Sequence, residues 1–308
     1  MQSLVPAQSA AHPLFTGLCA FPPTPADEKG RVDTTALQDL VSPIADSSAN
    51  SIGLVGSTGI YMYLETIERQ RAVEAALECV GGRCPVIVNV GALRTDVAIL
   101  LANHAAKAGA NGLLLAPVAY TPLTQDEVFQ HYRAVATTSD LPLCIYNNPS
   151  TTGFNFSEDL LGRLATISNI VAVKMPIAKD DDFSGEISRL RGRTPADFAI
   201  GYSGDWKAAE ALLAGCDAWH SVVGGLFPQA AAALVNAALT GDRTETMRLD
   251  GQFQPLWELF QSHGSLRVIH VAAHLLGHTR VNLPRPLLPL ARDIWPSVEK
   301  AILNVQKA

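Results

Sequence analysis

The chain has 308 residues, 48 % of them hydrophobic, which is enough for one large globular domain and a smaller appendage. Its net charge of −6 and its scattered lysines and arginines argue against binding to nucleic acid or to an anionic membrane. Its five cysteines lie mostly in apolar segments without Cys-x-x-Cys spacing, so we expect reduced core residues. The first residues do not resemble a secretion signal, and no apolar run approaches the roughly 18 residues of a membrane helix, which together predict a cytoplasmic protein that acts on a small molecule.

Short apolar segments alternate with segments of helical spacing along most of the chain. The predicted strands are 15–21, 51–55, 85–90, 112–116, 141–146, 169–174, 197–201 and 217–222. The predicted helices between them are 34–46, 67–80, 95–109, 124–138, 157–166, 181–191 and 205–214. Eight strands that alternate with helices, without a β-hairpin signal, predict a parallel sheet closed into a (β/α)8 TIM barrel.

The strand pattern stops at Pro228, and the rest of the chain has helical patterns with breaks near Thr240, His263 and Asn282. Catalytic residues of such barrels lie at the carboxyl ends of the strands, so we expect the functional residues there. The predicted division is a flexible N-terminal tail, a barrel that carries the active site, and a C-terminal helical domain, at 1–14, 15–227 and 228–308.

A lysine, Lys174, ends one of the apolar strands. Strand alternation places it on the same face as Ile170 and Ala172, so the amine is expected to point into the barrel. Burial disfavours the charged amine, and a neutral amine can attack a carbonyl carbon to form a Schiff base. A lysine at a strand end more often extends to solvent. Here Tyr146 ends the preceding strand in the same way, and parallel neighbours would bring the phenol and the amine to one pocket.

A second candidate site is Gly53-Leu-Val-Gly-Ser-Thr-Gly59, which follows a predicted strand. It has neither the spacing of a dinucleotide-binding loop nor the lysine of a Walker loop. Its small residues allow close approach of an anion, and Ser57 and Thr58 offer hydroxyl and amide groups, so we interpret the loop as a cradle for a carboxylate. The alternative is a simple tight turn.

Three histidines, His270, His274 and His278, recur at intervals of four residues and could face one side of a helix as metal ligands. No acidic residue accompanies them, and Gly277 is expected to weaken the helix before the last of them. We therefore predict no metal site and interpret the histidines as an ordinary helix surface or a subunit contact.

Three motifs resemble the signatures of the dihydrodipicolinate synthase and N-acetylneuraminate lyase superfamily. They are Gly56-Ser-Thr-Gly59, Tyr146-Asn-Asn-Pro149 and Val171-Ala-Val-Lys174, and the resemblance extends over nearly the whole chain. It implies a (β/α)8 barrel with a C-terminal helical domain, usually assembled as a homotetramer, whose members join or cleave 2-oxo acids through a lysine imine without a cofactor.

The resemblance also implies roles for individual residues. Lys174 would carry the imine and Tyr146 would transfer protons. Ser57 and Thr58 would hold the carboxylate of the 2-oxo acid, and Val222 would be a further substrate contact.

The chain departs from the family pattern on the side of the second substrate. Ile60 replaces a glutamate, Val118-Ala119 replaces a tyrosine pair, and Thr151 replaces an arginine that binds a carboxylate. An arginine-to-threonine change removes a bidentate anion clamp. Tyr120 is one position from the missing tyrosines, so we treat Ile60, Tyr120 and Thr151 as candidate pocket walls. Trp206 stands where sialate lyases usually have an acidic residue.

The leading prediction is therefore a class I aldolase or lyase that acts on pyruvate or a related 2-oxo acid through a Schiff base on Lys174, with the exact substrate open. A dihydrodipicolinate synthase is the second alternative and a 2-keto-3-deoxy sugar-acid dehydratase or aldolase the third. A degenerate 2-oxo-acid-binding protein would keep the imine site without turnover. A metal-dependent aldolase would need clustered His and acidic ligands at strand ends, which the sequence does not offer.

Overall fold

The computed structural model describes residues 11–278 and 282–306. Most of the predicted flexible tail lies outside these residues. Its last part is packed, because Ala11 and Leu14 are buried and the backbone N–H of His12 donates to the carbonyl oxygen of Asp197.

Eight parallel strands form a closed barrel in chain order, which confirms the predicted TIM barrel. The strands are β1 (Gly17–Ala20), β2 (Ser51–Leu54), β3 (Val86–Asn89), β4 (Gly112–Leu115), β5 (Leu143–Tyr146), β6 (Ile170–Met175), β7 (Ala199–Tyr202) and β8 (Ala218–Ser221). Tyr146 pairs with Lys174 in the register of β5 and β6, and Lys174 pairs with Gly201 of β7. The two residues that the sequence places at neighbouring strand ends are therefore direct neighbours.

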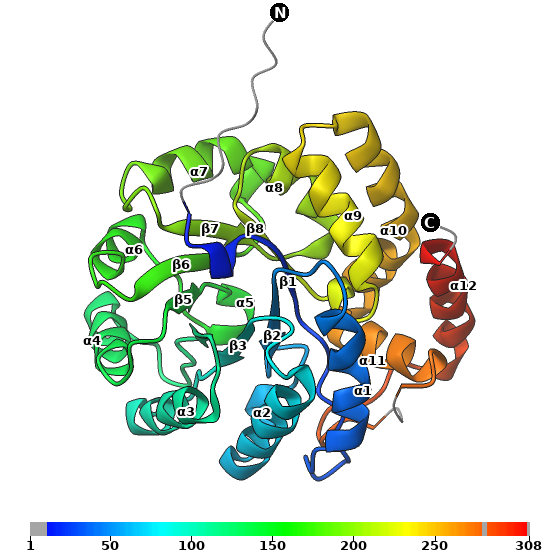
Figure 1. Ribbon diagram of the computed structural model, residues 1–308, viewed down its shortest axis with the longest axis horizontal. Coiled ribbons are helices and arrows are strands. Elements are labelled where there is room, and N and C mark those ends of the chain that lie inside the picture. The colour runs from blue at the N-terminus through cyan, green and yellow to red at the C-terminus, as the bar shows by residue number, and fades with distance from the viewer. Residues whose placement is uncertain (1–10, 279–281, 307–308) are drawn as a thin grey trace, which may run out of the picture.

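A ring of helices surrounds the barrel (Figure 1). The helices of the ring are α1 (Thr34–Ala45), α2 (Thr66–Val80), α3 (Thr95–Ala108), α4 (Gln125–Ala136), α6 (Glu158–Leu164), α7 (Phe183–Arg191), α8 (Ala208–Leu213) and α9 (Pro228–Leu239). A short helix, α5 (Pro149–Thr152), lies inside the ring. Helix α4 starts with a capping box in which Thr124 and Glu127 satisfy each other's backbone N–H groups. Helix α5 is a single turn directly after β5 that begins at Pro149.

Three further helices follow, α10 (Arg243–His263), α11 (Ser265–Leu275) and α12 (Trp295–Val305), and they gather at one side of the ring (Figure 1). Helix α9 packs against β1 and α8 as the eighth helix of the ring, and it also packs against α10. Helix α9 contacts both the barrel and the C-terminal helix α10, so a domain boundary at residue 228 remains a proposal.

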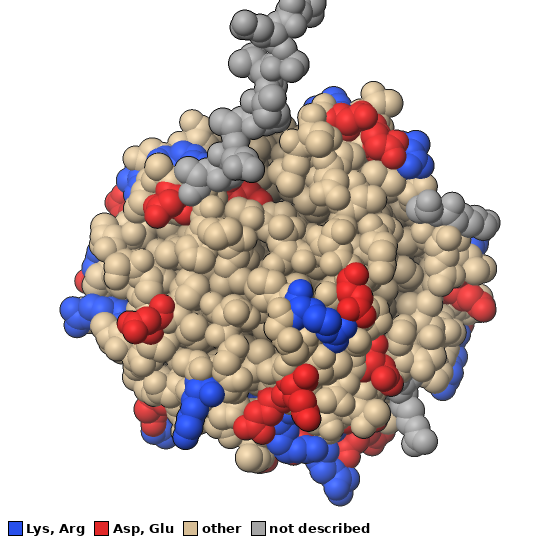
Figure 2. All heavy atoms as spheres, viewed as in Figure 1, with Lys and Arg blue, Asp and Glu red and all other residues tan. Residues whose placement is uncertain are grey.

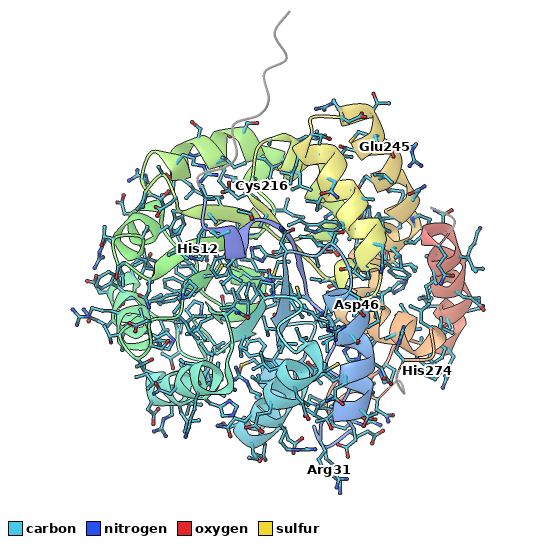
Figure 3. All side chains as sticks on the ribbon, viewed as in Figure 1. His12, Arg31, Asp46, Cys216, Glu245 and His274 are labelled. Atoms are coloured by element: carbon cyan, nitrogen blue, oxygen red, sulfur yellow. The ribbon has the colours of Figure 1, made fainter. Side chains whose placement is uncertain are left out.

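Charged side chains lie mainly at the periphery, where Arg31 and Glu245 are examples (Figure 3). On the face drawn in Figure 2, basic and acidic side chains are interspersed. Within the described part of the chain, no helix combines the length and the apolar character needed to cross a membrane.

Candidate active site

A cavity of about 510 Å³ lies at the carboxyl ends of the strands. The residues that line it are Phe21, Ser57, Thr58, Tyr146, Asn148, Ser150, Thr151, Lys174, Pro176, Ile177, Ser203, Gly204, Asp205, Trp206, His220, Val222, Phe260, Gly264, Ser265 and Leu266. They come from the ends of the strands and from the junction of α10 and α11, so the barrel supplies the floor and the C-terminal helices supply part of the wall.

Lys174 lies on the floor of this cavity with only 6 % of its surface exposed. Its Nζ atom is 4.0 Å from the centre of the Phe21 ring and 4.7 Å from the centre of the Tyr146 ring. The amine thus points inward, as strand alternation predicts, and two aromatic rings limit its access to water.

Tyr146 presents its hydroxyl group to the same cavity. This group is 2.9 Å from Ser57 Oγ and accepts a hydrogen bond from Asn148 Nδ2 at 3.2 Å. Burial by itself would raise the pKa of Tyr146, but the positive charge of Lys174 and the hydrogen bonds from Ser57 and Asn148 outweigh it and hold the pKa below its usual value. A phenol with a lowered pKa beside an amine is well suited to proton transfer.

The loop with Ser57 and Thr58 is held close to the barrel mouth by its glycines. A Cβ atom on Gly56 would lie 2.9 Å from the Phe21 ring, and one on Gly59 would lie 2.8 Å from Thr24 Oγ1. Only glycine therefore lets this loop pack so tightly, and both hydroxyl-bearing side chains line the cavity.

Two other predicted contacts, Val222 and Thr151, also line the cavity, as does Trp206. Ile60 and Tyr120 are not among the lining residues, so their prediction as pocket walls does not hold for the single chain. Ile60 has a backbone φ of +53° and is buried in the core behind the loop. Tyr120 is 94 % exposed and projects to solvent.

The three histidines of the C-terminal part do not share a surface. His270 is buried, and its Nε2 lies 3.2 Å from the carbonyl oxygen of Thr58. His274, labelled in Figure 3, packs against the ring of Trp295 at 5.3 Å between ring centres. The interpretation as an ordinary helix surface is therefore wrong for His270, because its helix packs that face onto the barrel. The described residues contain no group of three or more His, Cys, Asp or Glu side chains arranged to hold a metal ion.

The model of the dihydrodipicolinate synthetase family matches residues 14–305. The chain belongs to this family. It is 31 % identical to a 4-hydroxy-tetrahydrodipicolinate synthase of Methylococcus capsulatus, with 91 % of this chain and 94 % of that protein covered. It is 32 % identical to a protein of the same name from an Azoarcus species, with 94 % and 98 % covered.

Solved structures agree with this assignment. A dihydrodipicolinate synthase from Agrobacterium tumefaciens has a TM-score of 0.93 and 53 % identity, with 95 % of this chain and 98 % of that chain covered. The chloride-inhibited dihydrodipicolinate synthase of Acinetobacter baumannii, complexed with pyruvate, has a TM-score of 0.87 and 29 % identity, with 95 % and 99 % covered. The chain is thus an enzyme of the dihydrodipicolinate synthase-like lyases.

Sequence reasoning about this family member missed Asp205, a buried carboxylate in the cavity wall. Asp205 accepts hydrogen bonds from the backbone N–H groups of Val222 at 3.2 Å and Val223 at 2.7 Å, and from Trp219 Nε1 at 3.1 Å. Burial raises its pKa to about 6 despite these donors. Asp205 thereby fixes the turn that carries Val222, and the adjacent Gly204 was the only local signal for it.

A second missed residue is His220 on β8, which lies in the cavity and is only 2 % exposed. It stands in the middle of an apolar strand, where a histidine has no local pattern that marks it as functional. Strand alternation with Ala218 would have indicated that it faces the barrel interior.

Proposed function

We propose that the enzyme is a class I aldolase or lyase that acts on pyruvate or a related 2-oxo acid through a Schiff base on Lys174. The observation that carries the proposal is one buried cavity in which the Lys174 amine lies 4.7 Å from the Tyr146 ring and shares the space with Ser57 and Thr58. An amine, an acid–base group and an anion cradle are the three components that this chemistry needs.

In the proposed reaction, Ser57 and Thr58 hold the substrate carboxylate, which directs the ketone carbon toward Lys174. The neutral amine adds to this carbon, and the ketone oxygen leaves as water after protonation. Tyr146 is placed to move the protons of both steps, since its hydroxyl lies between Ser57 and Asn148. The resulting iminium accepts the electron pair released when a bond to C3 breaks.

The names of the relatives favour one specific alternative, a 4-hydroxy-tetrahydrodipicolinate synthase. In that alternative, we expect aspartate semialdehyde as the second substrate. The side chain of Thr151 argues against efficient catalysis of that reaction, because a neutral hydroxyl stands where the family pattern has an arginine. Its Oγ1 also donates to the carbonyl oxygen of Asn148 at 3.3 Å, so it is partly occupied. We rank this alternative second.

Trapping with sodium borohydride tests the proposal. Incubation with pyruvate and reduction should add a stable pyruvate-derived group to Lys174, identified by peptide mass spectrometry. Lys207 is a matched internal control near the same cavity, because Asp181 at 2.8 Å and Glu210 at 3.4 Å hold its amine in ion pairs. An adduct on Lys207 or another lysine instead of Lys174, or no adduct, would contradict the proposed function.

We also propose that the enzyme is cytoplasmic and assembles as a homotetramer. Large apolar side chains on its surface support assembly, and these are Met62, Tyr63, Leu93, Leu100 and Tyr120, which are 41 to 94 % exposed. Light scattering coupled to size-exclusion chromatography should give four times the mass of the chain, and a monomer would contradict the assembly.

A further inference from the structure

The cavity at the barrel mouth has a polar side and an apolar side. Ser57 and Thr58, which hold the carboxylate in the proposed function, follow β2, and β2 lies four strands from β6 in the closed ring of eight. Apart from Phe21, which lies against Lys174, the apolar side chains come from the segments after β6, β7 and β8 and from the junction of α10 and α11. We call them the apolar wall, and they are Pro176, Ile177, Trp206, Val222, Phe260 and Leu266.

Two residues of the apolar wall are held in place by their neighbours. Trp206 is the middle residue of a short helical turn, between Asp205 with its three hydrogen bonds and Lys207 with its two ion pairs. Ile177 packs closely on Gly204, where a Cβ atom would lie 2.5 Å from Ile177 Cγ1. The wall therefore presents a preformed apolar surface to a ligand.

The cavity offers a single side-chain cation. Among the described residues that line it, the ionisable groups are Lys174, Tyr146, Asp205 and His220. Burial and then the positive charge of Lys174 lower the pKa of His220 well below 6.5, so its ring stays neutral. The N-terminus of α11 also borders the cavity, but a helix end offers only about half an elementary charge. Because Lys174 serves the first carboxylate, a second one would find no basic side chain and would meet the carboxylate of Asp205.

Three hydroxyl groups of the cavity already donate within the protein. Ser150 Oγ donates to Asn148 Oδ1 at 2.7 Å, and Thr151 Oγ1 donates to the carbonyl oxygen of Asn148 at 3.3 Å. Ser203 Oγ donates to the carbonyl oxygen of Met175 at 3.0 Å. A carboxylate only accepts hydrogen bonds, so these hydroxyls can serve a second carboxylate only by giving up their present partners.

The geometry of the imine directs the rest of the substrate away from the cradle. The imine carbon C2 is trigonal, so its bonds to the Lys174 nitrogen, to the carboxylate carbon and to C3 point in three different directions. With the carboxylate held by Ser57 and Thr58, C3 points away from them and from the amine. A molecule that reacts at C3 therefore has the apolar wall, and not the cradle, as its surroundings.

We propose that the second substrate is an uncharged aldehyde with an apolar body that packs against Trp206 and Ile177. In the condensation, C3 loses a proton to give the enamine and then forms a bond to the aldehyde carbon. The electron pair of the aldehyde C=O bond moves to its oxygen, which takes up a proton. Water then releases a 4-hydroxy-2-oxo acid from Lys174, and it replaces the water lost when the imine formed. This inference rests on the proposed function, since it requires the imine.

Butyraldehyde and succinic semialdehyde test the proposal as a matched pair, because they have the same chain length and differ in a terminal methyl group or carboxylate. Each is incubated with the enzyme and pyruvate, and the 4-hydroxy-2-oxo acid is quantified by mass spectrometry. We expect kcat/KM to be at least roughly tenfold higher for butyraldehyde, because it leaves no charge unpaired in the cavity. Propionaldehyde and glyceraldehyde form a second pair that differs in two hydroxyl groups, and propionaldehyde should be the better substrate.

Replacements of Trp206 test the wall itself. Trp206→Arg supplies a cation and removes the indole, so it should shift the preference toward succinic semialdehyde by at least roughly tenfold. Trp206→Ala should lower kcat/KM for butyraldehyde by roughly tenfold, mainly through KM. Both variants should form the pyruvate adduct on Lys174 as the wild type does, because the cradle is unchanged. Met247→Ala, at an exposed apolar residue of α10 outside the cavity, is the matched control and should keep the wild-type preference.

The pyruvate adduct separates failure of this inference from failure of the proposed function. A wild type that forms the adduct but prefers succinic semialdehyde or glyceraldehyde would overturn this inference alone. The same conclusion follows if the adduct forms and none of the four aldehydes condenses, or if both Trp206 variants keep the wild-type preference. A wild type without an adduct on Lys174 would overturn the proposed function and this inference together.

Discussion

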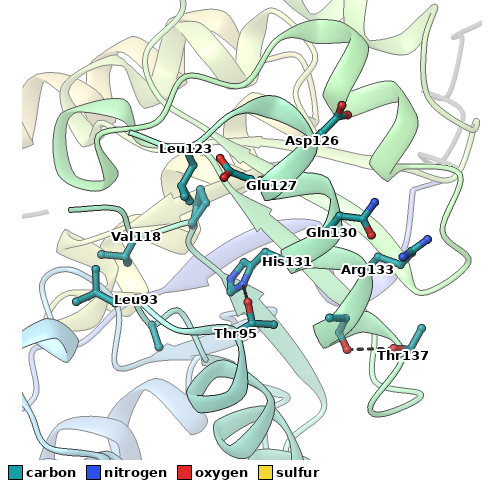
Figure 4. Close-up of a pocket in the computed structure, with 13 residues that line it drawn as sticks. Leu93, Thr95, Val118, Leu123, Asp126, Glu127, Gln130, His131, Arg133 and Thr137 are labelled. Carbon is teal, nitrogen blue, oxygen red and sulfur yellow. Dashed lines mark hydrogen bonds between the residues drawn. The ribbon is translucent and has the colours of Figure 1, made fainter. Parts of the chain in front are cut away.

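Two cavities of this enzyme each contain a buried histidine, but they differ in chemistry. The cavity at the barrel mouth measures about 510 Å³ and contains Lys174, Tyr146 and His220. A cavity of about 810 Å³ lies on the flank between α4 and the loops after β3 and β4, and it contains His131 (Figure 4). The larger cavity has neither a lysine nor a tyrosine among its lining residues.

The difference follows from what positions the side chains. At the mouth, the ends of parallel strands bring residues from distant parts of the chain to within a few ångströms of one another. On the flank, the single helix α4 supplies most of the polar groups, among them Glu127, Gln130 and His131 in Figure 4. His131 Nδ1 is 2.9 Å from Thr95 Oγ1, so its ring is anchored by a neighbour. Convergence of strand ends, and not cavity size, identifies the candidate active site.

Replacement of Lys174 should have the largest effect. Lys174→Met removes the nucleophile but keeps an unbranched side chain of similar length, so both the pyruvate adduct and turnover of any 2-oxo acid should fall to background. Lys207→Met is the control and should keep the adduct. Adduct formation in Lys174→Met, measured by mass spectrometry of the whole protein, would place the nucleophile elsewhere.

Tyr146→Phe should lower kcat by roughly 10²- to 10⁴-fold, because it removes the group that transfers protons during imine formation. The rate of adduct formation should fall with it, since the phenol hydroxyl contacts Ser57 in the carboxylate cradle. Tyr63→Phe, on the surface, is the matched control. Stopped-time borohydride trapping gives the rates, and a variant within twofold of the wild type would make Tyr146 a packing residue.

These two residues could be predicted from the sequence because the pattern that reveals them is local. Alternation along one strand fixes the face of Lys174, and the same rule places Tyr146 at the next strand end. His270 could not be found in this way, since its contact with Thr58 joins positions 212 residues apart. Ile60 was misplaced because it follows the motif directly, whereas its left-handed backbone turns it into the core.

The fold could be predicted from the sequence for a related reason. Eight repeats of strand and helix leave few parallel topologies, and the predicted end of each strand lies within two residues of the observed one. Asp205 escaped notice because its three partners, Trp219, Val222 and Val223, are assembled only when the loop after β7 meets the end of β8.

Thr151→Arg tests whether the cavity at the barrel mouth accepts aspartate semialdehyde as a second substrate. If aspartate semialdehyde enters, a guanidinium at this position would bind its carboxylate, and a charged hydrogen bond contributes about 1.5 to 3 kcal/mol, or roughly one to two decades in affinity. KM for the semialdehyde should fall while kcat changes little, because Ala119 still lacks a tyrosine hydroxyl. Efficient wild-type condensation, with a KM that the new arginine leaves unchanged, would instead rank the synthase first.

His270 provides the smallest effect and is a third buried histidine, whose partner is a backbone carbonyl group. Its Nε2 lies 3.2 Å from the Thr58 carbonyl oxygen, and burial lowers its pKa to about 4. The folded ring stays neutral between pH 6.5 and 4, whereas the unfolded ring takes up a proton there, so this histidine stabilises the fold above pH 6.5 and the contribution is lost as the pH falls toward 4. Between pH 7 and pH 5 the loss is about 2 kcal/mol by linkage.

His270→Phe should therefore be less stable than the wild type at pH 7 and should lose about 2 kcal/mol less than the wild type on going to pH 5. Urea unfolding at the two pH values measures both quantities, and His131→Gln gives a reference for a buried histidine on the flank. Because Thr58 lies in the carboxylate cradle, KM for the 2-oxo acid should also rise, by up to about tenfold for one neutral hydrogen bond. An equal loss of stability in His270→Phe and in the wild type would mean that the folded protein protonates His270 in this range, and its hydrogen bond to Thr58 would then be that of an imidazolium.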